Sequence, residues 1–539
     1  MKWIKKLMIW YLVFVLAKFV LSYTIPYPTA FSDSYIYAKM ARSIFYDLNL
    51  QVGGKAAFFP PLYSLALAPA YLFKSMNIIY PVMKLINALI SSLILFPSWL
   101  ITKEFTSKKK AVYAAVLVSI LPSNFSFSGY IMAENIFYPL FLFSVYFIYK
   151  SFTDERKIYP IISGIFIGLT FLTKTSAFML FIVVGLLFFF ASKKKALSIL
   201  AVGLGVILPW TLRNMFLLGF NLNVFFRTYD NIIEANNLFS STGILSFLIW
   251  IILYLGFLVL ASGILFSLAS ISFIKVKTDN KKQKVLSLIF LFSVATTLFV
   301  LAKYNVTTIF YKTSFGWLTG RPIGRYLDVL LPLILITGFL GLSNKKLYNL
   351  PIFFSSIILA ASSQLIFFPL FPVNNMSLTW LGIITYESKS IILFSILFFI
   401  LPFIVNFFYK RIKLNSLLKV FILFFLLVGM TNYTVDYVNS KTYWYNEDHI
   451  ILGAWLSKNF PANTNIIFDE RDCIDPITKF NQALCSPQFI PMAFWMNQNI
   501  AIGNVLNPPE NIDLIVSNHE LDYELIQSRN KINIYKIQK

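Results

Sequence analysis

The sequence predicts a polytopic α-helical membrane protein with a small α/β domain at its C-terminal end. Of the 539 residues, 58% are hydrophobic and only 13% are charged. A water-soluble domain of this length could not bury so many apolar side chains, so lipid must solvate much of the chain. Apolar runs of roughly 15 to 30 residues, broken by short lysine clusters, support the same fold class.

Thirteen apolar segments are predicted to cross the membrane. The first has the basic start of a secretory signal, but no small-residue cleavage site follows it, so we expect it to stay as an anchor. The predicted spans are 7–23, 79–102, 111–131, 135–149, 158–172, 175–191, 196–212, 244–274, 285–303, 326–343, 349–369, 390–409 and 416–431.

The basic residues orient these spans. With the N-terminus in the cytoplasm, seven cytoplasmic regions hold 24 basic and 4 acidic residues, whereas the rest of the chain holds 22 and 19. Cytoplasmic loops collect Lys and Arg, so the net charge of +23 is a signal of topology and does not indicate nucleic-acid binding. The seven regions are Lys2 with Lys5 and Lys6, 103–110, 150–157, Lys193 to Lys195, 275–284, Lys345 with Lys346, and 410–419.

This topology divides the chain into a transmembrane domain at 1–431, with a first outer loop at 24–78, and an extracytoplasmic domain at 432–539. The protein is expected in the cell (plasma) membrane. The C-terminal domain has 8 basic and 12 acidic residues. Its pattern predicts a helix in "DHIILGAWLSKNF" and strands in "TNIIFDE", "NIDLIVSN" and "KINIYKIQ".

The cysteine content does not narrow the fold or the function. Cys473 and Cys485 are the only two cysteines, too few for a disulfide framework. Both lie in the predicted outer domain, where oxidation is permitted, so a disulfide and two free thiols both stay open.

The first outer loop contains a predicted amphipathic helix. Apolar residues recur at helical spacing from Tyr37 to Leu48, while Lys39, Arg42 and Ser43 fall on other sides. We therefore expect this helix to lie in the membrane interface, with Asp33 at its start. Asp33 has two interpretations at this stage. It is a helix N-cap, for which "SDS" is well suited, or a functional carboxylate.

Charged residues gather on the predicted outer face. Lys174, in "GLTFLTKTSAFML", stands between two apolar runs with no acidic neighbour in sequence, where an uncompensated charge costs at least ~2.5 kcal/mol. A snorkelling lysine is the alternative interpretation. Several cations with two carboxylates suit an anionic lipid headgroup bound beside a general base. The carboxylates are Asp33 and Glu134, and the cations are Lys84, Lys174, Arg213, Lys303, Lys312, Arg321 and Arg325.

In this order along the chain, the motifs resemble those of the GT-C superfamily of membrane glycosyltransferases that use polyprenyl-phosphate sugars. The likeness is to the protein O-mannosyltransferase and lipid A aminoarabinose transferase group. Its elements are Asp33 followed by Tyr37 and Ala41, Pro60-Pro61-Leu62 in "AAFFPPLYSLALAPAYLF", Lys84 in "KLINALISSL", Glu134 in "GYIMAENIFYPL", "GLTFLTK", "PWTLRNMFLLGF" and "GRYLDVLLPLI".

The resemblance implies transfer of a sugar from a lipid phosphate to an acceptor hydroxyl with inversion. Asp33 would act as the base, with Glu134 orienting its partners or the acceptor. Cations would bind the phosphate leaving group. The phosphate-binding residues expected are Lys174, Arg213, Arg321, Arg325 and Lys84; Tyr37, Pro60, Pro61 and Tyr326 are expected to contact the acceptor or shape the loop. The expected partners are a polyprenyl-phosphate sugar, membrane lipid, and a protein, lipid or glycan acceptor.

The chain also departs from the family pattern. Phe58 and Phe59 precede the proline pair, where relatives often carry a charged residue or His. The first loop has no Asp-x-Asp pair, and His449 and His519 are the only histidines. No cofactor is expected to be required, and a dedicated divalent metal site is not expected.

Three other functions remain open at this stage. A transporter would also place charges in the membrane, but it would be expected to show internal repeats, and none is evident. A lipid-linked oligosaccharide ligase or polymerase would place its key residues in a large later loop. A structural membrane scaffold is the third. The sugar, the lipid length and the acceptor are not encoded in these motifs.

Overall fold

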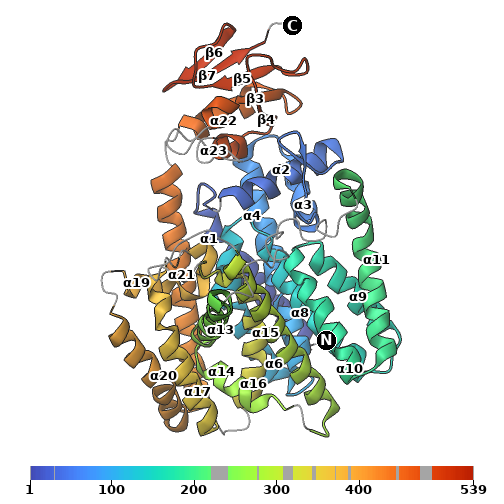
Figure 1. Ribbon diagram of the computed structural model, residues 1–539, viewed down its shortest axis with the longest axis vertical. Helices are drawn as coiled ribbons and strands as arrows, with labels where there is room; N and C mark the ends of the chain where they lie inside the picture. The colour runs from blue at the N-terminus through green and yellow to red at the C-terminus, as the bar shows by residue number, and fades with distance from the viewer. Residues whose placement is uncertain are drawn as a thin grey trace. The chain divides into compact units, whose positions relative to one another are not determined.

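The computed structural model describes residues 2–29, 31–219, 241–275, 278–307, 320–342, 347–368, 370, 372–386, 390–444, 448–473 and 489–537. It is mostly helical, with a five-stranded sheet near the C-terminus (Figure 1). Lys312 and Cys485 lie outside the described residues, so the predictions made for them have no structural counterpart. The chain divides into two compact units. The first is Met1–Lys18, Ala88–Phe127 and Glu134–Thr434, and the second is Phe19–Asn87, Ser128–Ala133 and Val435–Lys539.

All thirteen predicted spans fall on helices, which confirms the predicted fold class. The helices concerned are α1 (Lys2–Tyr23), α4 (Met76–Ser92), α5 (Leu95–Thr102), α6 (Lys108–Ser119), α7 (Pro122–Ser126), α8 (Glu134–Thr153), α9 (Ile158–Phe171), α10 (Phe178–Phe190), α11 (Lys193–Leu218), α13 (Ser241–Ala261), α14 (Leu265–Phe273), α15 (Lys281–Thr307), α16 (Leu331–Leu342), α17 (Asn349–Ala361), α20 (Ile391–Arg411) and α21 (Leu414–Trp444). Two further short helices are α18 (Pro372–Asn375) and α19 (Thr379–Ile384).

Fewer than thirteen full-length spans are found in the part of the chain that the structure describes. Among the described residues, nine helices are long and apolar enough to cross a membrane, or ten if the pair Lys108–Ser119 and Pro122–Gly129, bent by 67°, counts as one span. Helices α9 and α10 have 14 and 13 residues, and each rises only about 20 Å. The predicted span 244–274 is interrupted at Gly263 and Ile264, both of which have positive φ. Apolar composition cannot reveal such breaks.

Close helix packing in the first unit depends on small residues. A Cβ atom added to Gly341 on α16 would lie 1.9 Å from the Ala269 carbonyl oxygen on α14. A Cβ atom added to Gly338, one turn earlier, would lie 2.4 Å from the Phe266 carbonyl oxygen. Small residues let the backbones of membrane helices approach closely. The van der Waals contacts made at this short distance help to hold helices together in lipid.

We therefore expect Gly341→Ala to destabilise the protein by about 1–3 kcal/mol, because α14 and α16 must separate to admit the methyl group. The measurement is the thermal unfolding midpoint of the purified protein in detergent. Gly185→Ala on α10 is the matched control, since nothing lies within 4 Å of its added Cβ. Equal midpoints for the two variants would contradict the packing argument.

The second unit contains residues 24–78, the predicted first outer loop, and the C-terminal sheet. Its elements are α2 (Phe31–Asp47), β1 (Gln51–Val52), β2 (Lys55–Ala56), α3 (Leu62–Leu67), α22 (Asp448–Asn459), β3 (Asn465–Asp469), α23 (Phe489–Trp495), β4 (Asn499–Gly503), β5 (Leu514–Ser517), β6 (Glu524–Arg529) and β7 (Ile532–Lys536). The sheet order is β4-β3-β5-β7-β6, with β4, β3 and β5 parallel and the remaining pairs antiparallel. The predicted helix and all three predicted strands are confirmed as α22, β3, β5 and β7.

A single hydrophobic core joins α2 to this sheet. Tyr35 of α2 is buried with Phe468 of β3, Phe489 of α23 and Ile534 of β7. Its ring meets the Phe489 ring edge-on, with the centroids 5.7 Å apart. Helices α22 and α23 lie beside the sheet in Figure 1. Helix α2 and the C-terminal sheet therefore share one hydrophobic core.

The predicted helix is confirmed as α2, and its polar side is buried inside the second unit; its position in the membrane interface stays a prediction. Lys39 and Arg42 are buried, and the Lys39 ammonium donates to the Met496 carbonyl oxygen at 2.6 Å. Arg42 donates to the carbonyl oxygens of Asn497 at 2.8 Å and Ala462 at 2.6 Å. Leu48, predicted to be on the apolar face, is 90% exposed. The carbonyls replace water as partners of the two cations.

Candidate active site

The first unit contains a buried ion pair between Glu134 and Lys174. Glu134 opens α8, where a carboxylate interacts favourably with the helix dipole. Lys174 lies in the break between α9 and α10, in an extended conformation. Their side chains are 1% and 9% exposed, and the Lys174 ammonium donates to Glu134 Oε1. Glu134 is thus the counter-charge that the sequence around Lys174 lacks, which favours a compensated buried charge over a snorkelling lysine.

Arg325 and Tyr326 complete this group. The Arg325 Nε lies 4.0 Å from Glu134 Oε1, and the Lys174 ammonium lies 4.3 Å from the Tyr326 ring centroid. The Tyr138 hydroxyl, one turn along α8 from Glu134, donates to the Arg325 carbonyl oxygen at 2.8 Å. The structure therefore brings four predicted site residues together: Glu134, Lys174, Arg325 and Tyr326.

Asp328 is a further residue of this region that we did not predict. It is fully buried, three residues after Arg325, and interacts electrostatically with Glu134. Among the described residues, neither carboxylate oxygen has a hydrogen-bond partner of good geometry, although the Ser377 hydroxyl lies beside it. The sequence signal was a lone acidic residue in the apolar stretch "GRYLDVLLPLI". A buried carboxylate in an apolar segment is costly, so Asp328 is a further candidate site residue.

Arg213 and Arg321 also belong to the first unit. Arg213 lies near the end of α11, where its Nη1 donates to Asn214 Oδ1 at 2.9 Å and its guanidinium stands 5.1 Å from the Trp210 ring centroid. Arg321 is half-buried, and its carbonyl oxygen accepts a hydrogen bond from Asn305 Nδ2 at 3.1 Å. Both remain predicted phosphate-binding residues.

Lys303 also belongs to the first unit, whereas Asp33, Tyr37, Pro60, Pro61 and Lys84 belong to the second. Asp33 is half-buried and is the third residue of α2, which begins at Phe31, so it occupies the first turn of the helix and is not its N-cap. Tyr37 packs edge-on against the rings of Phe59 and Tyr63, with centroids 5.6 and 5.0 Å away. Pro60 is buried, and Pro61 immediately precedes α3. The proline pair thus starts the helix that supports Tyr37.

Lys84 lies in a second buried polar cluster. Its ammonium donates to the carbonyl oxygens of Ser22, at 2.8 Å, and Ile25. The carboxylate of Asp436 interacts with Lys84 and accepts hydrogen bonds from the hydroxyls of Thr29 and Tyr130. Asp436 was not predicted as a site residue, because it lies 352 positions after Lys84 in sequence.

The C-terminal sheet provides the one group of potential metal ligands in the described part of the chain. Ligand atoms of Asp469, Asp472 and His519 lie within 4.8 Å of one another. However, Asp469 already accepts hydrogen bonds from Arg471 Nη2 at 2.5 Å and Ser517 Oγ at 2.6 Å. A cation would have to displace the guanidinium. These contacts give Asp469 a structural role at the ends of β3 and β5, and the expectation that no metal is required stays a prediction.

The Asp469 contacts predict a pH dependence. Burial would raise the pKa of Asp469, but hydrogen bonds from Arg471 and Ser517 outweigh burial and hold this pKa below its ordinary value. A lowered folded-state pKa stabilises the fold above the unfolded-state pKa, near 3.9 for Asp, and this contribution is lost as pH falls through the folded-state pKa. Asp469→Asn should therefore cost about 1–3 kcal/mol at pH 7, with the difference from wild type shrinking below about pH 4.

The measurement is the thermal unfolding midpoint against pH for wild type, Asp469→Asn and the control Asp522→Asn. Asp522 is exposed, so its variant should follow wild type at every pH. A difference between Asp469→Asn and wild type that persists unchanged below pH 3 would contradict the assignment.

Residues 60–212 match the family model of dolichyl-phosphate-mannose-protein mannosyltransferase. This segment includes Pro60, Pro61, Lys84, Glu134 and Lys174. No relative among curated proteins matches the chain by sequence.

Solved structures extend the likeness to the whole chain. ArnT from Cupriavidus metallidurans bound to undecaprenyl phosphate is similar with a TM-score of 0.59 and 10% identity, and the match covers 98% of this chain and 97% of ArnT. The chain has the GT-C fold. Apo ArnT gives a TM-score of 0.53 at 10% identity with the same coverage. The apo oligosaccharyltransferase of Archaeoglobus fulgidus gives 0.48 at 14% identity, over 94% of this chain and 69% of that protein.

The GT-C likeness confirms the predicted resemblance, and the chain is an integral membrane protein. At 10% sequence identity, the likeness to ArnT establishes the fold and does not assign roles to residues. The roles of individual residues in this protein therefore rest on the geometry of its own side chains.

Proposed function

We propose that this protein is an inverting glycosyltransferase that moves a sugar from a polyprenyl phosphate to an acceptor hydroxyl on the extracytoplasmic face. The observation that carries the proposal is the buried group of Glu134, Lys174 and Arg325 within a GT-C fold. The family model matching residues 60–212 and the undecaprenyl phosphate bound by ArnT support a lipid-phosphate donor.

The charges of this group suit a phosphate leaving group. One carboxylate, Glu134, faces two cations, Lys174 and Arg325, so the three side chains keep a net positive charge. In a water-poor site such cations stabilise the negative charge that develops on the departing phosphate. The Arg325 guanidinium can hold two phosphate oxygens at once, whereas the Lys174 ammonium acts as a point charge. Glu134 is a positioning residue that holds Lys174 in place.

An acceptor hydroxyl is a weak nucleophile, so a base must remove its proton as the new bond to the sugar forms. We assign this role to Asp33 in the first turn of α2. The hydroxyl oxygen attacks the anomeric carbon, the bond from that carbon to the phosphate oxygen breaks, and the proton passes to the carboxylate. The phosphate leaves with the electron pair, and attack opposite to it inverts the anomeric centre. No metal takes part in this scheme.

The test is sugar transfer by the purified full-length protein, with a panel of polyprenyl-phosphate monosaccharides as donors and peptide, lipid and glycan acceptors. Release of polyprenyl phosphate together with a glycosylated acceptor of inverted configuration would support the proposal. Movement of a solute across proteoliposomes with no transfer from any donor would overturn it in favour of a transporter.

A further inference from the structure

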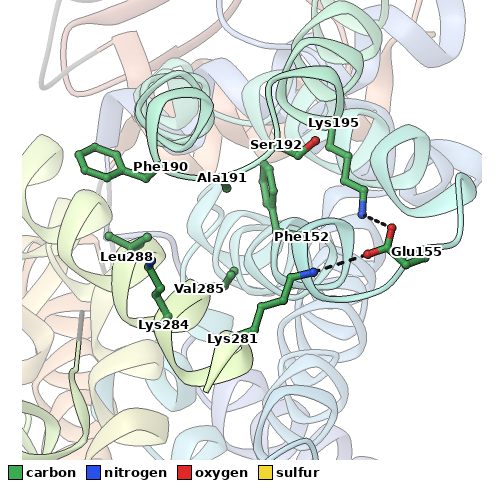
Figure 2. A pocket seen from close by; sticks show the side chains of 10 residues that line it. All are labelled: Phe152, Glu155, Phe190, Ala191, Ser192, Lys195, Lys281, Lys284, Val285 and Leu288. Atoms are coloured by element: carbon green, nitrogen blue, oxygen red, sulfur yellow. Dashed lines mark hydrogen bonds and ion pairs between the residues drawn. The ribbon is translucent and has the colours of Figure 1, made fainter. Parts of the chain in front are cut away.

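A cavity of about 440 Å³ lies in the first unit, where the end of α8, the turn between α10 and α11 and the start of α15 meet (Figure 2). The Lys193–Lys195 and 275–284 regions that border it are both predicted to be cytoplasmic. The groups discussed under the candidate active site do not line this cavity. It is therefore a separate feature of the molecule.

Three lysines give the cavity an excess of positive charge. Lys195, Lys281 and Lys284 line it, against one carboxylate, Glu155. Figure 2 shows Lys195 and Lys281 reaching Glu155 from two helices. The ammonium nitrogen of Lys195 lies 3.2 Å from one Glu155 carboxylate oxygen, and that of Lys281 lies 3.5 Å from the other. The Glu155 side chain is 81% exposed, and exposed ion pairs of this kind contribute little. A single solvated carboxylate therefore leaves capacity for a further anion.

The other part of the cavity wall is apolar. Phe152 and Leu288 are buried and line it together with Phe190. Phe190 is 57% exposed and is the last residue of α10, an all-apolar helix, while α11 begins three residues later with three lysines. Such a change from apolar to basic residues is typical of the boundary between hydrocarbon and headgroups. The ligand that fits must be amphipathic.

We propose that this cavity binds an anionic glycerophospholipid, with the lysines holding its phosphate and Phe190 and Leu288 contacting its acyl chain. The lysines match a phosphodiester in charge, and basic pockets between membrane helices recognise such headgroups. Inorganic phosphate shares that charge but would not cover the exposed apolar surface of Phe190, which is 57% exposed. The lipid is distinct from the polyprenyl-phosphate donor, and this inference does not rest on the transferase proposal.

The test compares lipid binding by full-length wild type and a triple variant, Lys195→Gln/Lys281→Gln/Lys284→Gln. The probes are phosphatidylglycerol, phosphatidylcholine with the same acyl chains, and inorganic phosphate, added to delipidated protein in neutral detergent. Bound lipid is counted by native mass spectrometry over a concentration series. The matched control is Lys108→Gln/Lys109→Gln/Lys110→Gln, which removes the same charge from three exposed lysines at the start of α6.

We expect the triple variant to bind phosphatidylglycerol at least tenfold more weakly than wild type, because each lysine near an anionic headgroup contributes to affinity. The control should bind like wild type. Equal binding by all three proteins would overturn the proposal, as would equal wild-type affinity for phosphatidylcholine. Full competition by millimolar inorganic phosphate would show a small-anion site and also overturn it.

A second pair of variants keeps the test decisive if the triple variant misfolds. Lys284→Glu reverses one exposed charge and should weaken binding of phosphatidylglycerol. Phe190→Ser, also at an exposed position, should weaken binding of the lipid without changing that of inorganic phosphate. Wild-type lipid affinity in both variants would overturn the proposal.

Discussion

Asp33→Asn is expected to lower sugar transfer by ~100-fold or more while donor binding is retained. The amide keeps the size and shape of the carboxylate but cannot accept the proton of the acceptor hydroxyl. Because donor binding is assigned to cations and not to Asp33, the dissociation constant for the polyprenyl-phosphate sugar should stay close to that of wild type. The measurements are single-turnover transfer and donor affinity on the same preparations.

Asp47→Asn provides the matched control. Asp47 ends the same helix, α2, and is 43% exposed in an ion pair with Arg42 at 3.3 Å. Its variant should transfer sugar at the wild-type rate, because Arg42 keeps the carbonyl oxygens of Asn497 and Ala462 as acceptors when the Asp47 carboxylate is lost. Transfer by Asp33→Asn at the wild-type rate would remove Asp33 from the mechanism and leave it only the stabilising role of an acidic residue in the first helical turn.

Glu134→Ala is expected to destabilise the protein by about 3–5 kcal/mol, because it leaves the Lys174 ammonium buried without its counter-charge. Transfer should fall as well, since Lys174 would lose the group that positions it. The thermal unfolding midpoint and the transfer rate are the measurements. Glu155→Ala is the control, because the Glu155 carboxylate is 81% exposed and pairs with Lys195 in solvent.

The double variant Glu134→Leu/Lys174→Met separates net stabilisation from the cost of an unpaired charge. Replacing both partners by apolar residues of similar volume removes the buried charge, so the double variant should be more stable than Glu134→Ala. It should still lack transfer activity, since the cation assigned to the phosphate is gone. A Glu134→Ala variant as stable as wild type would show that the ion pair contributes nothing to the fold.

Apolar patterning predicted the helices well, and its failures are local. Every predicted span is helical, because the length of an apolar run is a direct consequence of solvation by lipid. The run 158–191 breaks at Lys174, as predicted, but its two halves have 14 and 13 residues and do not qualify as full spans. The interruption at Gly263 was missed, since glycine inside an apolar run carries no signal of its own conformation.

In the candidate site, too, the sequence predicted single residues but not their partners. Lys174 was singled out because an isolated cation between apolar runs is costly, and that argument needs only neighbours in sequence. Its actual partner, Glu134, is 40 residues away. Asp328 was missed although it is a lone acidic residue in an apolar stretch, because the sequence does not show that it lies close enough to Glu134 to interact electrostatically. Such pairings arise when separate helices pack together.

Helix α2 shows where reasoning from sequence ends. Its helical spacing was readable, because periodicity is a property of one segment. The surroundings of its polar side were not, because water and the buried carbonyl oxygens of Met496 and Asn497 both satisfy Lys39 and Arg42. Solvation by lipid and helix periodicity depend on residues that are neighbours in sequence, so both can be predicted from the sequence. The partners of Lys39 and Arg42 lie more than 400 residues away in sequence. Only the tertiary structure brings these segments together and so decides which groups the buried charges contact.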